Sequence, residues 1–265
     1  MWLRVCFALS AAACLYAADN QLTAEEKKAG WILLFDGHSF ENWEDPTLKS
    51  PPGDSFTIDD GCLKATSHPK ITEDLFTKQS WGDFDLAWDW KIAPRGNSGL
   101  KYRIQDRVWV TGQTAPKFED KVNAALRNRL TTRPDHGQDY VIGFEYQMTD
   151  DTTNSDAVHN GPKHRTAALY DIFAAQNTEP KPVGEFNHSA LVVRGKHVEH
   201  WLNGRKVLDA RLDAPEIAAG MAKRWDVDSP VYSLLVSQPR VHCPISLQNH
   251  DDNAWFKNIK IRPLD

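Results

Sequence analysis

The chain has 265 residues, with 31 basic and 36 acidic side chains and a formal net charge of -5. No run of Lys or Arg could follow a phosphate backbone, which argues against nucleic acid as a partner. The length suits two small domains or one β-sandwich, and a single domain is favoured because no long flexible linker interrupts the middle of the chain.

The N-terminus has the pattern of an export signal. One positive residue, Arg4, precedes a short apolar run that ends in small residues at Ala17 and Ala18. The run is too short to span a bilayer, so we predict a cleaved signal peptide over residues 1–18 and a secreted or periplasmic protein without a transmembrane segment. The alternative is a lipoprotein that is lipidated at Cys14.

Two cysteines, Cys62 and Cys243, remain after cleavage. They could pair in an oxidising compartment, but two cysteines form no disulfide framework. Isolated buried thiols are therefore the favoured interpretation.

From Gly30 onward, short alternating runs are bounded by Gly, Pro, Asp and Asn, as in antiparallel β-proteins. A dozen such strands in one chain predict an all-β fold with two packed sheets, forming a single domain over residues 19–265. The predicted strands are 31–35, 56–58, 62–66, 84–92, 98–105, 141–148, 167–172, 188–194, 197–202, 206–210, 245–248 and 254–261.

A tight turn, three helices and an insertion are predicted before or between these strands. Asn203-Gly204 favours the positive φ values of a type I′ turn and predicts a tight hairpin. A short capped helix is expected after Thr23, a longer helix over 117–130 and a third over 214–223. The segment at about 106–138 breaks the strand rhythm with charge, Pro and a helix. We predict a helical insertion over one end of the sandwich, either a binding loop or a surface excursion.

Two predicted strands carry a polar face. Alternate residues of a strand point to opposite sides, so Glu145 and Gln147 share one face of 141–148, and Lys101, Arg103 and Gln105 share one face of 98–105. If these strands are neighbours, Glu145 and Arg103 meet on a surface suited to a polyhydroxylated ligand. The alternative is a cross-strand ion pair on an exposed sheet face.

Loops around strand 141–148 contain His and Asp residues that could bind a metal. They show neither EF-hand spacing nor a His-Glu-x-x-His motif, so polar loops without a metal are favoured and no cofactor is expected; loop-bound calcium is the alternative. Nucleophile-elbow, phosphate-loop and dinucleotide motifs are also missing from the sequence. The loop residues are His136, Asp139, Asp150, Asp151, Asp156, His159 and His164.

Six segments in register, covering the chain from Gly30 to its end, resemble the secreted bacterial 3-keto-disaccharide hydrolase family. The chain departs from the family pattern in the insertion between Gln105 and Val141 and at Asn249 and Asp251. The segments are GWILLFDG (30–37), NSGL (97–100), FEYQ (144–147), ALYD (168–171), HWLNG (200–204), and ISLQNH (245–250) leading to FKNIKI (256–261).

This resemblance implies a concanavalin A-like jelly-roll fold. It also implies cleavage of glycosides already oxidised to a ketone at sugar carbon 3, with the ketone made by a separate sugar 3-dehydrogenase. Such a ketone acidifies the hydrogen on C2. A base can then form an enolate that expels the aglycone from C1, after which water is added.

On this hypothesis Glu145 is the base or acid, Arg103 clamps the oxyanion or a ring hydroxyl, and His250 is the second proton-transfer group. Each residue also has a structural interpretation, with His250 as a turn residue. The expected ligands of sugar hydroxyls, which could equally be packing or surface side chains, are Gln147, Tyr170 and Gln248.

Two other functions suit the same sequence. A sandwich of this kind could be a lectin-like carbohydrate-binding module without catalysis, since fold does not fix function. It could also be a conventional glycosidase, which needs a second carboxylate at about 5 to 9.5 Å from Glu145. Asp171 is the candidate, although Tyr170 and Asp171 would point in opposite directions on a strand.

Overall fold

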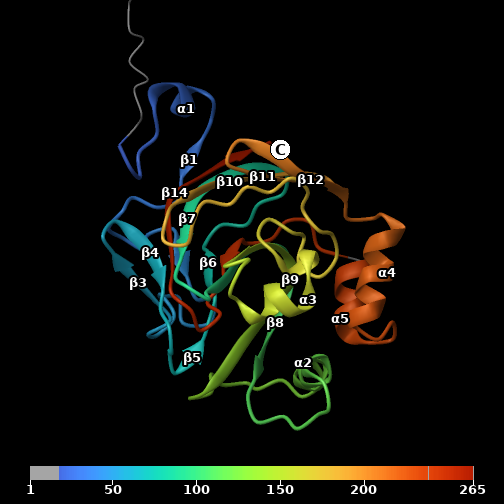
Figure 1. The fold of residues 1–265 in the computed structure, drawn as a ribbon. Coiled ribbons are helices and arrows are strands. Elements are labelled where there is room, and N and C mark those ends of the chain that lie inside the picture. The colour runs from blue at the N-terminus through green and yellow to red at the C-terminus, as the bar shows by residue number, and fades with distance from the viewer. Residues whose placement is uncertain (1–17, 238, 265) are drawn as a thin grey trace, which may run out of the picture.

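The computed structural model describes residues 18–237 and 239–264 and shows two β-sheets packed face to face (Figure 1). The larger sheet contains β1 (Ile32–Leu33), β3 (Phe56–Asp59), β4 (Cys62–Ala65), β7 (Phe84–Ile92), β10 (Asn187–Arg194), β11 (His197–Leu202), β12 (Arg205–Arg211) and β14 (Ala254–Pro263). The smaller sheet contains β2 (Trp43–Glu44), β5 (Ile71–Thr72), β6 (Leu75–Thr77), β8 (Asn97–Val110), β9 (Gly137–Thr149) and β13 (Ser246–Leu247).

The strand order is β12-β11-β10-β7-β14-β4-β3 in the larger sheet, with β1 beside β14, and β2-β6-β13-β8-β9-β5 in the smaller sheet. The pairs are antiparallel apart from β5 and β9. This arrangement confirms the predicted two-sheet jelly-roll sandwich. The helical segments are α1 (Ala24–Lys28), α2 (Phe118–Arg127), α3 (Ser155–Asn160), α4 (Pro215–Arg224) and α5 (Pro230–Tyr232), with short turns η1 (Pro162–His164) and η2 (Ser233–Ser237).

The core lies between the sheets and follows the predicted alternation. Tyr102 on β8 and Tyr146 on β9 are fully buried, and the Tyr146 ring meets Trp88 of the opposite sheet edge-on at 5.0 Å. A polar bond also crosses the core, because the Tyr102 hydroxyl lies 3.0 Å from Nε2 of His200 on β11. Nδ1 of His200 contacts the carbonyl of Ala167 at 2.8 Å. Burial lowers the pKa of His200 to about 4, so this imidazole is neutral.

The turn and helix cap that are determined by a few adjacent residues are confirmed, whereas one predicted strand is not. Asn203 and Gly204 have φ values of 48° and 82° and join β11 to β12, which confirms the predicted hairpin. Thr23 caps α1 in a reciprocal capping box with Glu26. The predicted strand over 167–172 is wrong. Its backbone turns at Ala167 and Asp171, which have φ values of 65° and 63°. The backbone N–H of Tyr170 still donates to the carbonyl of Glu145 at 3.1 Å.

The predicted insertion at 106–138 is partly an extension of the sheet. β8 continues to Val110 and β9 begins at Gly137, so the non-strand part is limited to residues 111–136 with α2 in its middle. Figure 1 shows α2, α4 and α5 outside the sandwich, beyond the strands β8 and β9. An ion pair of 3.2 Å between Arg224 and Glu119 joins the end of α4 to α2.

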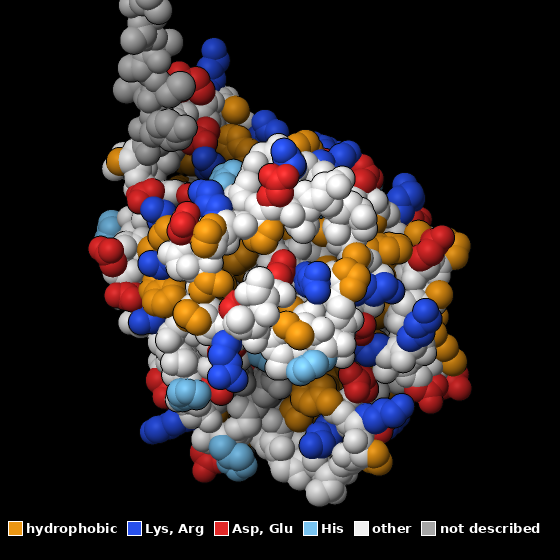
Figure 2. Space-filling model, in the orientation of Figure 1, with side chains coloured by type: hydrophobic (Ala, Val, Ile, Leu, Met, Phe, Trp, Pro, Cys, Tyr) orange, Lys and Arg blue, Asp and Glu red, His pale blue; other side chains and the backbone are white. Residues whose placement is uncertain are grey.

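Cys62 and Cys243 are buried free thiols, as predicted. Residues 1–17 of the predicted signal peptide lie outside the described residues. Within the part that is described, no helix is both long and apolar enough to cross a membrane. Basic and acidic side chains are interspersed over the face shown in Figure 2.

Candidate active site

A cavity of about 260 Å³ lies against β8 and β9, and α4, α5 and the segment after β13 supply its other walls. This volume is close to the lower end of the range for small-molecule sites, about 300–1,000 Å³. The cavity brings together five of the six predicted site residues. Its polar lining consists of Asn97, Lys101, Gln138, Tyr140, Glu145, Gln147, Tyr170, Arg224, Gln248 and His250.

Glu145 lies directly opposite Lys101 in the β8–β9 pair and is half-buried in the cavity wall. No described residue donates a hydrogen bond to its carboxylate. Burial raises the pKa of Glu145 to about 7, against the opposing effect of the Lys101 ammonium. This carboxyl group can therefore both accept and release a proton near neutral pH.

Gly99 on β8 makes room for this carboxyl group. A Cβ atom at position 99 would lie 2.2 Å from Oε1 of Glu145 and 2.7 Å from its Cδ. The Glu145 side chain therefore lies across the backbone of Gly99, and any larger residue there would displace it.

Lys101 places a positive charge beside Glu145. Its Nζ donates to Oδ2 of Asp74 at 3.1 Å, and the hydroxyl of Ser246 donates to the same oxygen at 3.0 Å. Burial opposes the charge, but Asp74 and Glu145 outweigh it and raise the pKa of Lys101. The sequence placed Lys101 on the polar face, yet nothing in its pattern singled it out.

The prediction that Arg103 shares this surface with Glu145 is wrong. Tyr102 pairs with Phe144 and Asp106 pairs with Ile142, so the three residues 103–105 of β8 face one residue of β9, Gly143. Arg103 adopts a φ of 50° in this bulge. Its Nη2 donates to Asp83 at 3.1 Å and to the carbonyl of Gly195 at 2.8 Å, so the guanidinium is held away from the cavity.

Arg224, at the end of α4, supplies the guanidinium that the sequence assigned to Arg103. Its Nη2 donates to the Tyr140 hydroxyl at 3.3 Å, and its guanidinium lies 5.4 Å from the Tyr170 ring. Although burial opposes the charge, Tyr140, Tyr170 and Asp171 raise the pKa of Arg224 and keep it protonated. The predicted helix over 214–223 ends one residue before Arg224, but no local signal placed that end at the cavity.

A chain of alternating charges lies behind Tyr170. The Tyr170 hydroxyl donates to Asp156 at 3.0 Å, and the His164 imidazole lies 3.0 Å from Asp156 and 3.3 Å from Asp171. Burial alone would favour neutral imidazole, but the two carboxylates raise the pKa of His164 to about 9. His164 and Asp156, two of the loop residues considered for metal binding, are therefore joined in ion pairs.

Two amide oxygens at one end of the cavity have no partner among the described residues. They are Oδ1 of Asn97 and Oε1 of Gln248, both on side chains that are more than nine-tenths buried. Buried acceptors are nearly always satisfied, so these two are suited to the hydroxyl groups of a ligand. Gln147 is buried beside them, and His250 lies exposed at the rim.

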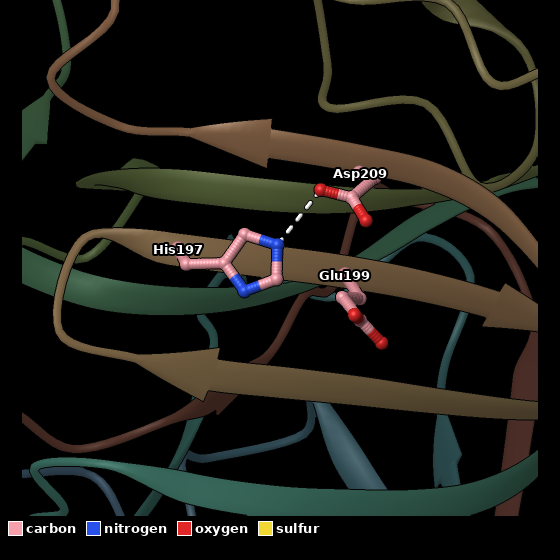
Figure 3. A group of neighbouring side chains, drawn as sticks. All are labelled: His197, Glu199 and Asp209. Carbon is pink, nitrogen blue, oxygen red and sulfur yellow. Dashed lines mark hydrogen bonds and ion pairs between the residues drawn. The ribbon is translucent and has the colours of Figure 1, made fainter.

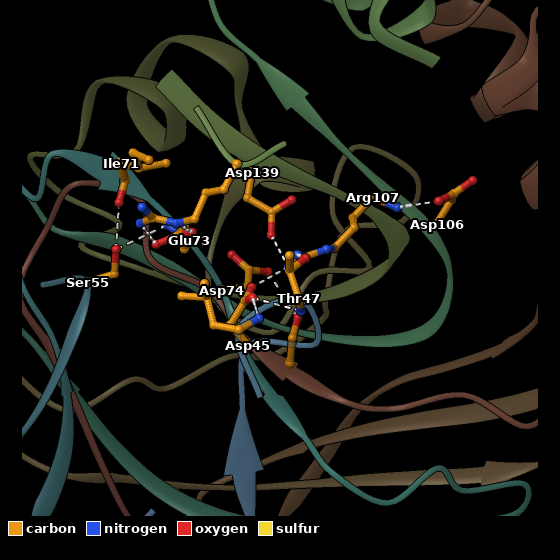
Figure 4. A network of polar contacts seen from close by, with 12 residues as sticks. Asp45, Thr47, Ser55, Ile71, Glu73, Asp74, Asp106, Arg107 and Asp139 are labelled. Atoms are coloured by element: carbon orange, nitrogen blue, oxygen red, sulfur yellow. Dashed lines mark hydrogen bonds and ion pairs between the residues drawn. The ribbon is translucent and has the colours of Figure 1, made fainter. Parts of the chain in front are cut away.

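Asp139, another loop residue considered for metal binding, belongs to a buried ion network at the base of the insertion (Figure 4). Nη1 of Arg107 lies 2.5 Å from Asp45 and 2.7 Å from Asp139, and Arg133 pairs with Glu73 at 2.7 Å. These bonds attach the extended β8–β9 hairpin to the loops before β3 and β6.

A separate group of possible metal ligands lies on β11 and β12, where His197, Glu199 and Asp209 converge within 4.8 Å (Figure 3). His197 already contacts Asp209 at 2.7 Å, and Lys206 donates to Asp209 at 2.6 Å and to Glu199 at 3.2 Å. Because an ammonium occupies the position of a cation, we assign no metal to this group.

A jelly-roll sandwich whose cavity combines several amides with a half-buried carboxyl group defines a protein with a site suited to a polyhydroxylated ligand. More specifically, the chain belongs to the family described as 3-keto-alpha-glucoside-1,2-lyase-like domain, whose model matches residues 30–262. This match confirms the family resemblance found in the sequence.

Individual relatives agree with this assignment. A 3-keto-disaccharide hydrolase of Bacteroides thetaiotaomicron is 26% identical over 254 residues, covering 89% of this chain and 79% of that protein. A crystal structure of a candidate glycosyl hydrolase from Parabacteroides distasonis superposes with a TM-score of 0.70 at 26% identity, covering 94% of this chain and 100% of that one. A second protein from the same organism shares the fold with a TM-score of 0.56 at 22% identity, covering 88% and 99% of the two chains.

Proposed function

We propose that this protein cleaves glycosides that carry a ketone at carbon 3 of the sugar, by elimination followed by addition of water. The observation that supports this most directly is Glu145, a half-buried carboxyl group to which no described residue donates a hydrogen bond. Its pKa is about 7, and it faces two cations in a polar cavity. A base of this kind is suited to removing a weakly acidic C–H proton at neutral pH.

In this mechanism Glu145 takes the proton from C2, and the electron pair passes into the C3 carbonyl to give an enolate. Re-formation of the carbonyl breaks the bond between C1 and the aglycone oxygen and leaves an enone, while an acid supplies the proton to the leaving oxygen. Water then adds its hydroxyl to C1 and a proton to C2. The sum is hydrolysis to the 3-keto sugar and the free aglycone.

The charge that develops on the C3 oxygen needs a fixed donor, and Arg224 takes this role in place of Arg103. Its charge is held at the cavity wall by Tyr140 and Glu119. Lys101 adds positive potential, although its ammonium is bonded to Asp74. His250, exposed at the rim, is the second proton-transfer group.

The amides hold the sugar ring. Gln147 and Gln248 line the cavity, and Asn97 joins them with an oxygen that has no partner among the described residues. Tyr170 contributes its ring and a hydroxyl that already donates to Asp156, so its remaining capacity is that of an acceptor for a sugar hydroxyl.

The conventional glycosidase mechanism has less support. Glu145 is the one carboxylate among the described residues that line the cavity, and Asp171 forms ion pairs with His164 and Arg224 instead. No cofactor takes part in this mechanism. The protein is exported, and a sugar 3-dehydrogenase makes the ketone beforehand.

The test is to incubate the purified protein with 3-keto-trehalose and with trehalose and to follow release of the second sugar. We expect cleavage of the oxidised sugar alone, and a loss of about 10²–10⁴ in rate for Glu145→Gln, which is the usual worth of a positioned acid or base. Cleavage of unoxidised trehalose would favour the glycosidase mechanism. Binding of either sugar without cleavage would favour a lectin-like module.

A further inference from the structure

We infer that the end of the cavity beyond Glu145 is an aglycone site for an aromatic group, so that the preferred substrates are 3-keto-glycosides of aromatic alcohols. This inference rests on the proposed function and names its substrate class. It comes from the walls that α2, α4 and α5 add to the β-sandwich.

The wall at this end is aromatic. Phe118, the first residue of α2, meets the Tyr140 ring edge-on at 5.3 Å, and Tyr140 lies 6.1 Å from the Trp225 ring just after α4. Phe118 keeps 37% of its surface exposed, while Trp225 is buried. Phe118 and the half-buried Tyr140 are thus the rings of this wall that remain accessible to a ligand. Edge-on or offset contact with a second ring is the geometry that aromatic pairs favour.

The rest of this wall is aliphatic apart from the amide of Gln138. Met221 of α4, Val231 of α5 and Leu235 of η2 all line the cavity and are buried. A second sugar ring would bring several hydroxyl groups to this surface. Buried hydroxyls need partners, and the Gln138 amide and the Tyr140 hydroxyl, which accepts one bond and still carries an O–H, are too few for a whole sugar ring. An apolar aromatic group has no such requirement.

The order of residues along β9 separates the two ends. Tyr140 precedes Glu145 by five residues on β9, on the side away from Gln147, and its ring lies 5.9 Å from Nζ of Lys101, the residue opposite Glu145. The amides of Asn97, Gln147 and Gln248 lie at the other end of the cavity. A sugar held by these amides therefore has its reacting carbons near Glu145 and directs its aglycone toward Phe118 and Trp225.

The experiment compares 3-keto benzyl glucoside with a 3-keto-disaccharide, two substrates whose leaving groups are both alcohols. We expect a lower KM for the benzyl glucoside. Phe118→Ala should raise that KM about 3- to 10-fold, the worth of one aromatic contact, and should leave KM for the disaccharide and kcat for both substrates within two-fold. The matched control is Leu130→Ala, an exposed apolar residue of the same insertion that does not line this cavity.

An equal or lower KM for the disaccharide would overturn the inference while leaving the proposed function intact. So would an equal effect of Phe118→Ala on both substrates. If neither substrate is cleaved, the proposed function fails, and calorimetric titration of Glu145→Gln with 3-keto benzyl glucoside tests the site by itself. Binding that is weakened by Phe118→Ala and not by Leu130→Ala then supports the aromatic site, and any other result rejects it.

Discussion

At the scale of single residues, the chemistry depends on the protonation of Glu145. Burial raises its pKa to about 7, and the base must be ionised to act. We therefore expect kcat/KM for a 3-keto-glycoside to rise with pH and to level off above a midpoint near 7. A fall in kcat/KM over the same range would instead make Glu145 the acid.

The same pKa fixes the sign of a stability effect. The folded protein holds this proton up to about pH 7 and the unfolded chain only up to about pH 4.5, so the wild type loses stability as the pH rises through this window. Glu145→Gln should accordingly raise the free energy of unfolding at pH 8, by at most about 3 kcal/mol, and change it little at pH 4. Urea denaturation at the two pH values measures this, and an equal effect at both would show that Glu145 titrates normally.

Gly99→Ala tests whether the position of the Glu145 carboxylate matters when the residue itself is unchanged. The backbone of Gly99 does not require positive φ, but its new Cβ would come within 2.2 Å of Oε1 of Glu145. We expect the variant to fold and to lose about 10²-fold in kcat/KM, because a displaced base is nearly as poor as a missing one. Gly112→Ala is the control, since no atom lies within 4 Å of its added Cβ. Full activity of Gly99→Ala would mean that the observed Glu145 position is not the catalytic one.

At the scale of elements, the bulge in β8 explains why the sequence chose the wrong arginine. Alternation holds from Leu100 to Tyr102, and one irregular turn of the backbone at Arg103 then breaks it. The lining of the cavity contains no residue of β8 beyond Lys101. The sequence gives little warning of this bulge beyond Gly143 on the opposite strand. The hairpin at Asn203-Gly204, by contrast, was predictable because two adjacent residues determine it.

Because Arg224 and not Arg103 lines the cavity, we expect substitutions of the two arginines to have opposite effects on stability and activity. Arg103→Gln should lower the melting temperature, because it breaks buried bonds to Asp83 and Gly195, yet keep kcat/KM within about two-fold. Arg224→Gln should reduce kcat/KM by about 10²–10³, the usual cost of losing an oxyanion donor. Arg224→Lys keeps the charge and should recover part of the loss. Steady-state kinetics with thermal unfolding checks all three variants, and a larger kinetic defect in Arg103→Gln would reverse the assignment.

At the scale of the whole molecule, the sandwich was predictable and the cavity was not. Alternating apolar runs and turn residues are local patterns, and they are enough to predict most strands and the fold class of the protein. The cavity joins segments that are far apart in the sequence, from Asn97 and Lys101 to Arg224 and Gln248. Only the packing of α2 and α4 beside β8 and β9 brings these segments together, and such packing leaves no local pattern.

The two sheets are also joined by a buried group that makes the whole fold sensitive to acid. His200 on β11 contacts Tyr102 on β8 and the carbonyl of Ala167, and its pKa is lowered to about 4. The unfolded chain takes up this proton near pH 6.5 and the folded protein only near pH 4. Stability should thus decrease as the pH falls through this window, by at most about 3 kcal/mol.

His200→Gln isolates this effect, because an amide can keep both hydrogen bonds and does not titrate. We expect the difference in free energy of unfolding between wild type and variant to shrink or change sign as the pH falls from 6.5 to 4, measured by urea denaturation at several pH values. His38→Gln, an exposed position, should leave the wild-type curve unchanged. Parallel curves for wild type and His200→Gln would show that the bond across the core does not depend on a neutral imidazole.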